Sequence, residues 1–269
     1  MGDVKVGKRI AIVGTANSWR DTPWDDPTLE IWGLNDAYTL GFPRCDRWYE
    51  LHPIDHFYFR PLKDRVVYAD DVPHGYYVRP QGHLEWLQQA AKTIPVFLQS
   101  DPPAGWPPNA QRFPREAVTQ AFGTYWASGP AYEVAHAILE GASEIHVYGI
   151  HLSTEAEYRE QRPQFEHMLG IARGRGIKIV MATSSPVLKH GWQYGYEPKP
   201  AMHPAKVKLM HVRHAKGELA AKLVTMPASK QGPARDRLRR LEAMEMDCLQ
   251  RMQNREPVRI TAPVFQIGA

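Results

Sequence analysis

Short apolar runs bounded by turn-forming residues recur along roughly the first two hundred residues of the chain. β-branched and aromatic residues are common in these runs, as is typical of buried strands in a parallel sheet. The sequence therefore predicts six strands, which cover residues 8–14, 30–35, 46–52, 94–98, 144–150 and 177–181.

Segments with helical periodicity lie between several of these strands. Apolar residues spaced by three and four predict helices near residues 84–93, from Ser128 to Gly141, and over residues 162–173. Polar residues and prolines instead predict a long loop over residues 15–27. Alternating strands and helices imply crossover connections, so we expect an α/β fold with a Rossmann-like, mainly parallel sheet and helices on both faces.

The pattern changes from Lys206 onward. Two helical stretches, residues 206–225 and 234–254, predict a C-terminal helical hairpin. An apolar stripe on the second stretch predicts packing on the main domain or on a second copy of the chain, as a homodimer. The stripe consists of Leu238, Leu241, Met244, Cys248 and Met252. We therefore divide the chain into a main domain (1–204), the hairpin (205–256) and a tail (257–269).

Basic residues are concentrated in the hairpin. The formal charge of the chain is +4, yet residues 1–204 carry 20 Lys/Arg against 23 Asp/Glu, a net charge of −3. Residues 205–255 carry 12 against 5, a net charge of +7. Such segregation is usually a solvated helical face, but it is also expected of a surface that meets phosphate groups.

The sequence predicts neither a membrane span nor a metal centre. No stretch approaches the roughly 20 apolar residues of a transmembrane helix, and the first residues lack the apolar core of a signal peptide. Cys45 and Cys248 lie far apart and show no zinc-type spacing. We therefore expect a cytoplasmic protein with no membrane contact, no disulfide and no bound metal.

Polar residues follow the first two predicted strands and open one predicted helix. They are Gly14, Thr15, Asn17, Ser18, Asn35, Ser128 and Gly129. Ligands bind at the carboxyl ends of parallel strands, where glycine lets the backbone approach them and a helix N-terminus attracts an anion. The GxGxxG and GK[ST] patterns are absent, which argues against an NAD site and a P-loop. A plain turn after the first strand and an N-cap role for Ser128 are the alternatives.

Four segments, residues 14–18, 31–35, 128–131 and 141–150, together resemble the bacterial CMP-sialic-acid-dependent sialyltransferases. They also resemble related nucleotide-binding proteins, including archaeal-type pterin pyrophosphokinases and many uncharacterised phage proteins. The likeness extends over roughly residues 8–196. It implies a nucleotide-sugar donor held without a metal or a permanently bound cofactor. The implied donor contacts are Gly14, Ser18, Asn35, Ser128 and Gly129.

The chain departs from this family at two places. His151 stands where these proteins usually carry an aspartate, and residues 158–162 stand where their catalytic histidine lies. Transfer of an activated group to a hydroxyl requires a base. His151, at the carboxyl end of a predicted strand, is the candidate base, and Glu157 and Glu160 are its rivals. A structural histidine is the alternative. His52 follows the third predicted strand, where two interpretations are open: it faces the same cleft or, as we favour, it is structural.

The same transfer requires donors that stabilise the departing phosphate. Arg162 offers a planar bidentate guanidinium, and Tyr194 and Tyr196 offer hydroxyl groups. A surface ion pair for Arg162 and aromatic packing for the two tyrosines are the alternatives.

We therefore expect a metal-independent glycosyltransferase-like enzyme that uses a nucleotide-sugar. The basic hairpin and the likeness to phage proteins suggest a hydroxymethylated base in double-stranded DNA as acceptor, contacted by Arg235, Arg239 and Arg240. Two other classes remain open. One is a nucleotide-dependent pyrophosphokinase or hydrolase that acts on a small molecule, and the other is a non-catalytic nucleotide-binding assembly protein.

Overall fold

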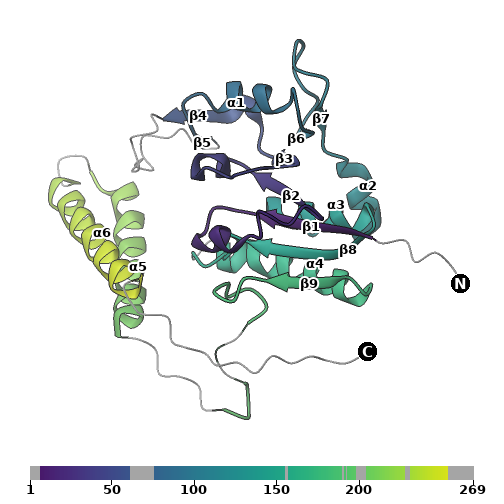
Figure 1. The fold of residues 1–269 in the computed structure, drawn as a ribbon. Helices are drawn as coiled ribbons and strands as arrows, with labels where there is room; N and C mark the ends of the chain where they lie inside the picture. Colours follow the sequence, from purple (N-terminus) through teal and green to yellow (C-terminus); the bar gives the residue numbers. More distant parts are fainter. Residues whose placement is uncertain are drawn as a thin grey trace, which may run out of the picture. The chain divides into compact units, whose positions relative to one another are not determined.

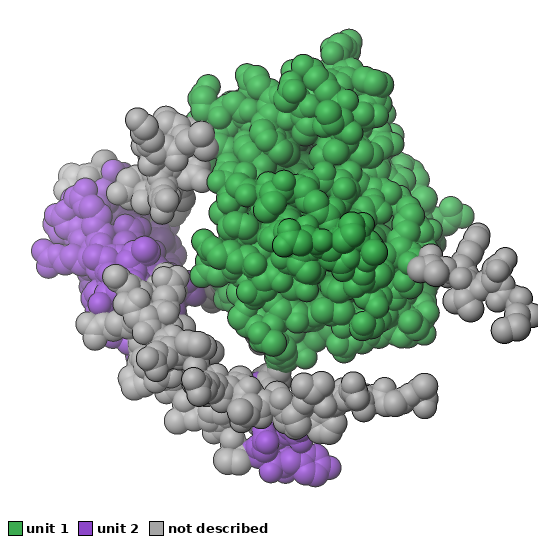
Figure 2. Space-filling model, in the orientation of Figure 1, with its two compact units in different colours: residues 1–190 green, residues 191–269 purple. Residues whose placement is uncertain are grey.

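The computed structural model describes residues 7–60, 76–154, 157–189, 191, 193–197, 204–227 and 231–253. The chain forms two compact units, residues 1–190 and residues 191–269, which Figure 2 colours separately. The first unit contains the sheet, and the second contains the two hairpin helices.

A seven-stranded sheet forms the centre of the first unit. Its strands lie in the order β7-β6-β3-β2-β1-β8-β9, and each neighbouring pair is parallel (Figure 1). Their bounds are Lys8–Val13 (β1), Leu29–Leu34 (β2), Arg47–Glu50 (β3), Val96–Leu98 (β6), Ala110–Arg112 (β7), Ala142–Tyr148 (β8) and Lys178–Met181 (β9). This arrangement confirms the predicted α/β class with a Rossmann-like parallel sheet.

Three short strands were not predicted from the sequence. β7 buries only Ala110 and so produces no apolar run. Phe57–Arg60 (β4) and Tyr77–Pro80 (β5) form a separate two-stranded parallel sheet within a region rich in prolines and aromatic residues.

Helices cover both faces of the large sheet. On one face lie α2 (Arg115–Phe122), α3 (Gly129–Leu139) and α4 (Arg162–Gly174), which share a core with Ile10 and Ile12 of β1. The alternate residues Ala11 and Val13 point to the other face. That face is covered by α1 (His83–Ala90) and by two short 3-10 helices, Asn17–Asp21 and Ala37–Leu40. The first of these 3-10 helices lies inside the predicted loop.

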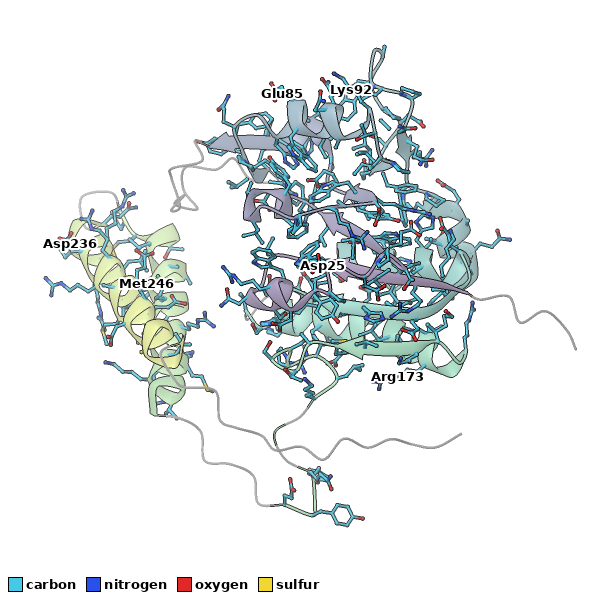
Figure 3. The ribbon with its side chains drawn as sticks, in the orientation of Figure 1. Asp25, Glu85, Lys92, Arg173, Asp236 and Met246 are labelled. Atoms are coloured by element: carbon cyan, nitrogen blue, oxygen red, sulfur yellow. The ribbon has the colours of Figure 1, made fainter. Side chains whose placement is uncertain are left out.

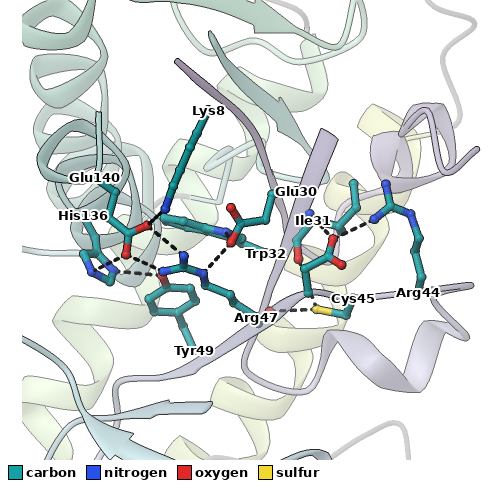
Figure 4. Close-up of polar contacts among 11 residues, drawn as sticks. Lys8, Glu30, Ile31, Trp32, Arg44, Cys45, Arg47, Tyr49, His136 and Glu140 are labelled. Carbon is teal, nitrogen blue, oxygen red and sulfur yellow. Dashed lines mark hydrogen bonds and ion pairs between the residues drawn. The ribbon is translucent and has the colours of Figure 1, made fainter. Parts of the chain in front are cut away.

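An ion-pair network occupies the amino edge of the sheet (Figure 4). Arg47 of β3 bridges Glu30 and Glu140, and its guanidinium lies 4.9 Å from the Trp32 ring centroid. Burial alone would raise the pKa of Glu140, but hydrogen bonds from Arg47 and Lys8 lower it to about 2. These charged side chains are therefore mutually neutralised, and the network ties α3 to β1, β2 and β3.

The second unit contains α5 (Pro204–Thr225) and α6 (Gln231–Gln253), which pack against each other. Arg213 and Lys216 of α5 both bind Glu245 of α6, and Cys248 is buried. Met246, labelled in Figure 3, is 65 % exposed. Over the residues that the structure describes, no helix is both long and apolar enough to cross a membrane.

A fully buried carboxyl group lies within α3. Glu133 is fully buried, and neither of its carboxyl oxygens has a hydrogen-bond partner among the described residues. Burial raises its pKa well above the usual 4.5. An unsatisfied buried polar group lowers the stability of the folded state.

Replacing Glu133 with methionine is expected to stabilise the protein at neutral pH. The wild-type carboxyl stays protonated in the folded state after the unfolded chain has released its proton, because its pKa is raised. The free energy of unfolding of the wild type is therefore unaffected by this ionisation below about pH 4.5. It declines by at most ~1.4 kcal/mol per pH unit as the pH rises from there towards the native pKa. Denaturant unfolding of Glu133→Met should show a gain of about 1–3 kcal/mol at neutral pH and a weaker pH dependence.

Glu116→Met on α2 is the matched control, because the Glu116 side chain is largely exposed. Its stability should change by less than about 0.5 kcal/mol. A loss of stability in Glu133→Met would show that the carboxyl group has a partner in solution.

Candidate functional site

The order of the strands changes direction between β1 and β8. β1 pairs with β2 on one side and with β8 on the other, and Val13 lies opposite both Gly33 and Tyr148. The three strands therefore end at one level, and the loops that follow them are neighbours. In doubly wound sheets this switch point, at the carboxyl ends of the strands, is where ligands bind.

Two glycines meet at the switch point. The Gly14 amide donates to the Tyr148 carbonyl at 2.9 Å, and the Ala16 amide donates to the Gly149 carbonyl at 2.8 Å. A Cβ on Gly14 would lie 2.6 Å from the Gly149 carbonyl oxygen, and a Cβ on Gly149 would overlap the Gly14 carbonyl. Gly149 also has a φ of +64°, a conformation that glycine adopts readily. Gly14 is thus required by backbone packing, and its predicted ligand contact remains a prediction.

Ser18 and His151 connect the same two loops. The buried Ser18 hydroxyl accepts a hydrogen bond from the Gly149 amide at 2.9 Å and lies 2.9 Å from His151 Nε2. Burial, together with the charge of Lys189, lowers the pKa of His151. Its imidazole is therefore neutral at physiological pH, as a general base must be before it takes a proton.

The N-terminus of α3 lacks a side-chain cap. Ser128 occupies the N-cap position, but its hydroxyl donates to Gln164 Oε1 at 3.2 Å and makes no cap hydrogen bond. Gln164 is fully buried, and its Nε2 has no partner among the described residues. A Cβ on Gly129 would meet nothing within 4 Å, so packing does not require this glycine. Helix amides and a side-chain amide without partners suit an anion.

The described non-glycine residues with positive φ all lie in loops at this edge. They are Asn35 after β2, Leu152 after β8 and Leu188 after β9, with φ angles of 53°, 47° and 57°. The Asn35 backbone is fixed by β3, because its amide donates to the Tyr49 carbonyl. Its side chain makes no hydrogen bond within the described part of the chain. Backbone strain of this kind clusters at ligand sites.

The predicted catalytic residues after β8 lie in an irregular helical turn. Glu157 and Glu160 belong to a π-helical segment, Glu157–Gln161, that leads directly into α4. Such turns are frequent at functional sites. Arg162 begins α4 and is held by Glu166 and by the carbonyls of the loop after β9. Its guanidinium therefore positions that loop, and a contact with phosphate remains a prediction.

Lys189, in the same loop, was not among the residues predicted from the sequence. Its ammonium donates to the carbonyls of Ala182 and Thr183 at 3.1 and 2.6 Å, and burial lowers its pKa. No strand or helix pattern pointed to it, because it lies in an irregular loop. The lysine adds a positive charge close enough to His151 to influence its pKa.

The other predicted donor contacts are exposed. Thr15 and Asn17 present their side chains to solvent in the loop after β1. Tyr194 and Tyr196 are 87 % and 90 % exposed and belong to the second unit. Their phosphate contacts remain predictions.

Among the described residues, no group of three or more His, Cys, Asp or Glu side chains is arranged to hold a metal ion.

Comparison with family models, with curated proteins and with solved structures finds no match to the chain.

Adding one methyl group at Gly149 is expected to destabilise the first unit. Gly149→Ala should lose roughly 2–5 kcal/mol in urea unfolding, because the new Cβ overlaps the Gly14 backbone and φ is positive. Gly129→Ala is the control, since open space surrounds that position, and its stability should change by less than about 1 kcal/mol. Equal stability of the two variants would contradict the close contact between the glycines.

Proposed function

We propose that the switch point binds a nucleotide-activated sugar and that the protein is a metal-independent glycosyltransferase-like enzyme. The observation that carries the proposal is the N-terminus of α3, which has no side-chain cap, beside Gln164 Nε2, which has no hydrogen-bond partner among the described residues. These donors suit the diphosphate or phosphate of a nucleotide, because helix amides bind anions. The type of donor follows from the sequence resemblance.

His151 is the proposed base. Ser18 Oγ has two lone pairs, and the Gly149 amide uses one of them. If His151 Nε2 carries its proton and donates to the other, Nδ1 is left with a lone pair that can accept a proton. In the transfer, the acceptor oxygen forms a bond to the anomeric carbon as its proton passes to His151. The bond from that carbon to the phosphate breaks, and its electron pair leaves with the nucleotide.

Ligand-induced thermal stabilisation tests the donor site. A ligand that binds only the folded state raises Tm by linkage, so UDP-, GDP-, CMP- and ADP-linked sugars can be compared directly. We expect one of these nucleotide classes to raise Tm without added metal. The absence of any shift, up to millimolar ligand, would contradict the proposal. Turnover that requires a divalent metal would favour a pyrophosphokinase or hydrolase.

Loss of the base should affect turnover more than donor binding. We expect His151→Ala to lower kcat by about 10²–10⁴-fold while donor affinity remains nearly unchanged. Because burial lowers the pKa of His151, wild-type kcat should stay constant as the pH falls through about 6.5 and decline only below that value. A comparable loss in Glu157→Ala or Glu160→Ala alone would assign the base to that glutamate.

We infer that the acceptor is a polyanion, with hydroxymethylated bases in double-stranded DNA as the first candidate. The residues that support this are on α6, where Arg235, Arg239 and Arg240 are exposed. Among the described residues, Arg239 pairs with one carboxylate, that of Asp236 on the same helix, and both side chains are open to solvent. Such a pair contributes little to stability and can exchange for a phosphate.

Charge reversal on α6 tests this acceptor. Duplex DNA binding by the wild type should weaken steeply between low and physiological salt, since each neutralised phosphate releases about one counterion. Changing Arg235, Arg239 and Arg240 to glutamate should abolish that binding. Reversing Lys92, Arg173 and Arg175 in the first unit is the control and should preserve it. Salt-independent binding, or binding unaffected by the α6 reversal, would contradict a nucleic-acid acceptor.

A further inference from the structure

A buried ionised carboxylate lies at the end of β3. Glu50 is fully buried, and Arg79 of β5 donates to its two oxygens from Nε and Nη2 at 2.8 and 3.0 Å. His83 Nε2, at the start of α1, lies 2.9 Å from the same carboxylate. Burial alone would raise the pKa of Glu50, but hydrogen bonds from His52, His83 and Arg79 hold it well below its usual range. The negative charge is therefore permanent at physiological pH.

His52 is the partly exposed member of this cluster. Its Nδ1 lies 2.6 Å from Glu50 Oε1 and 2.7 Å from Arg79 Nη2. The ring can therefore donate to the carboxylate or accept from the guanidinium without moving. Nε2 is an acceptor in the first case and a donor in the second. The His52 side chain is 29 % exposed, and Nε2 makes no hydrogen bond to the described residues.

An aromatic ring lies beside this imidazole. The ring centroids of His52 and Tyr77 are 4.3 Å apart, and Tyr77 of β5 is exposed. The His52 Nε2 can donate or accept a hydrogen bond, and it lies next to a partly exposed aromatic ring. This combination suits a ligand that has both a flat ring and hydroxyl groups. A nucleoside is such a ligand, because its base stacks on aromatic rings and its ribose hydroxyls both donate and accept.

The cluster lies on the same edge as the candidate site. β3 is separated from β1 by β2 alone, and neighbouring strands are about 5 Å apart, so the ends of β3 and β1 are separated by about 10 Å. Asn35, whose side chain makes no hydrogen bond within the described part of the chain, follows β2 between them. A nucleotide with its phosphate at the switch point can extend along this row, away from β8 and His151.

We propose that His52 and Tyr77 form the nucleoside subsite of the donor site. His52 Nε2 binds a ribose hydroxyl, Tyr77 stacks on the base, and Glu50 and Arg79 are positioning residues that orient the imidazole. This inference rests on the proposed function, since it assumes that a nucleotide binds at the switch point. It also revises the structural interpretation of His52 made from the sequence.

A comparison of nucleotide binding with pyrophosphate binding distinguishes the nucleoside subsite from the part of the site that binds phosphate. Titration calorimetry with UDP, GDP, CMP and ADP identifies the nucleotide that the wild-type protein prefers. His52→Ala should bind that nucleotide about tenfold more weakly, the loss expected for one hydrogen bond, and should bind inorganic pyrophosphate as the wild type does. His52→Asn should recover part of the nucleotide affinity, because its amide both donates and accepts.

His56→Ala is the matched control. His56 is an exposed histidine in the same region, stacked on Tyr76 and not bonded to Glu50, and its replacement should leave nucleotide affinity unchanged. Thermal unfolding of each variant confirms that it is folded. If His52→Ala does not fold, Tyr77→Ala replaces it, since the exposed ring can be removed without disturbing the Glu50 ion pair.

The outcomes distinguish this inference from the proposed function. A wild-type protein that binds none of the four nucleotides overturns both. Unchanged nucleotide affinity in folded His52→Ala and Tyr77→Ala overturns the nucleoside subsite alone. Equal weakening of nucleotide and pyrophosphate in His52→Ala also overturns it, because His52 would then act through the fold or on the phosphates.

Discussion

The backbone contact between Gly14 and Gly149 is the constraint on which the carboxyl edge of the sheet depends. The two turns approach so closely that neither position has room for a side chain. This approach brings Ser18 to the Gly149 amide and His151 to Ser18. The arrangement is fixed by main-chain packing in the protein alone, so a ligand would meet groups that are already in position.

The two edges of the sheet satisfy their polar groups in different ways. At the amino edge Arg47 and Glu140 neutralise each other and join three strands to α3. At the carboxyl edge the N-terminus of α3 has no side-chain cap, and Gln164 Nε2 has no partner among the described residues. Unsatisfied buried donors cost stability, so the two edges differ in what they contribute to the fold.

Six strands and five helices could be predicted, because each lies within a longer stretch of clear apolar pattern. The helix α2 was missed along with β4, β5 and β7. The site could be predicted only to the level of the loops that form it. The sequence does not show that the Ser128 hydroxyl donates to Gln164 and does not cap α3, or that Arg162 donates to carbonyls of the loop after β9. Both bonds depend on how elements meet in space. The Glu50 cluster was missed for the same reason, because its members come from β3, β5 and α1.

The separation of the two edges also bears on how such a protein can evolve. Thr15, Asn17 and Tyr77 are exposed on loops or on the small sheet, away from the Arg47 network. Substitutions at these positions can accumulate without weakening the ion pairs that hold the strands together. The fold can therefore be kept while the side chains that would contact a ligand change.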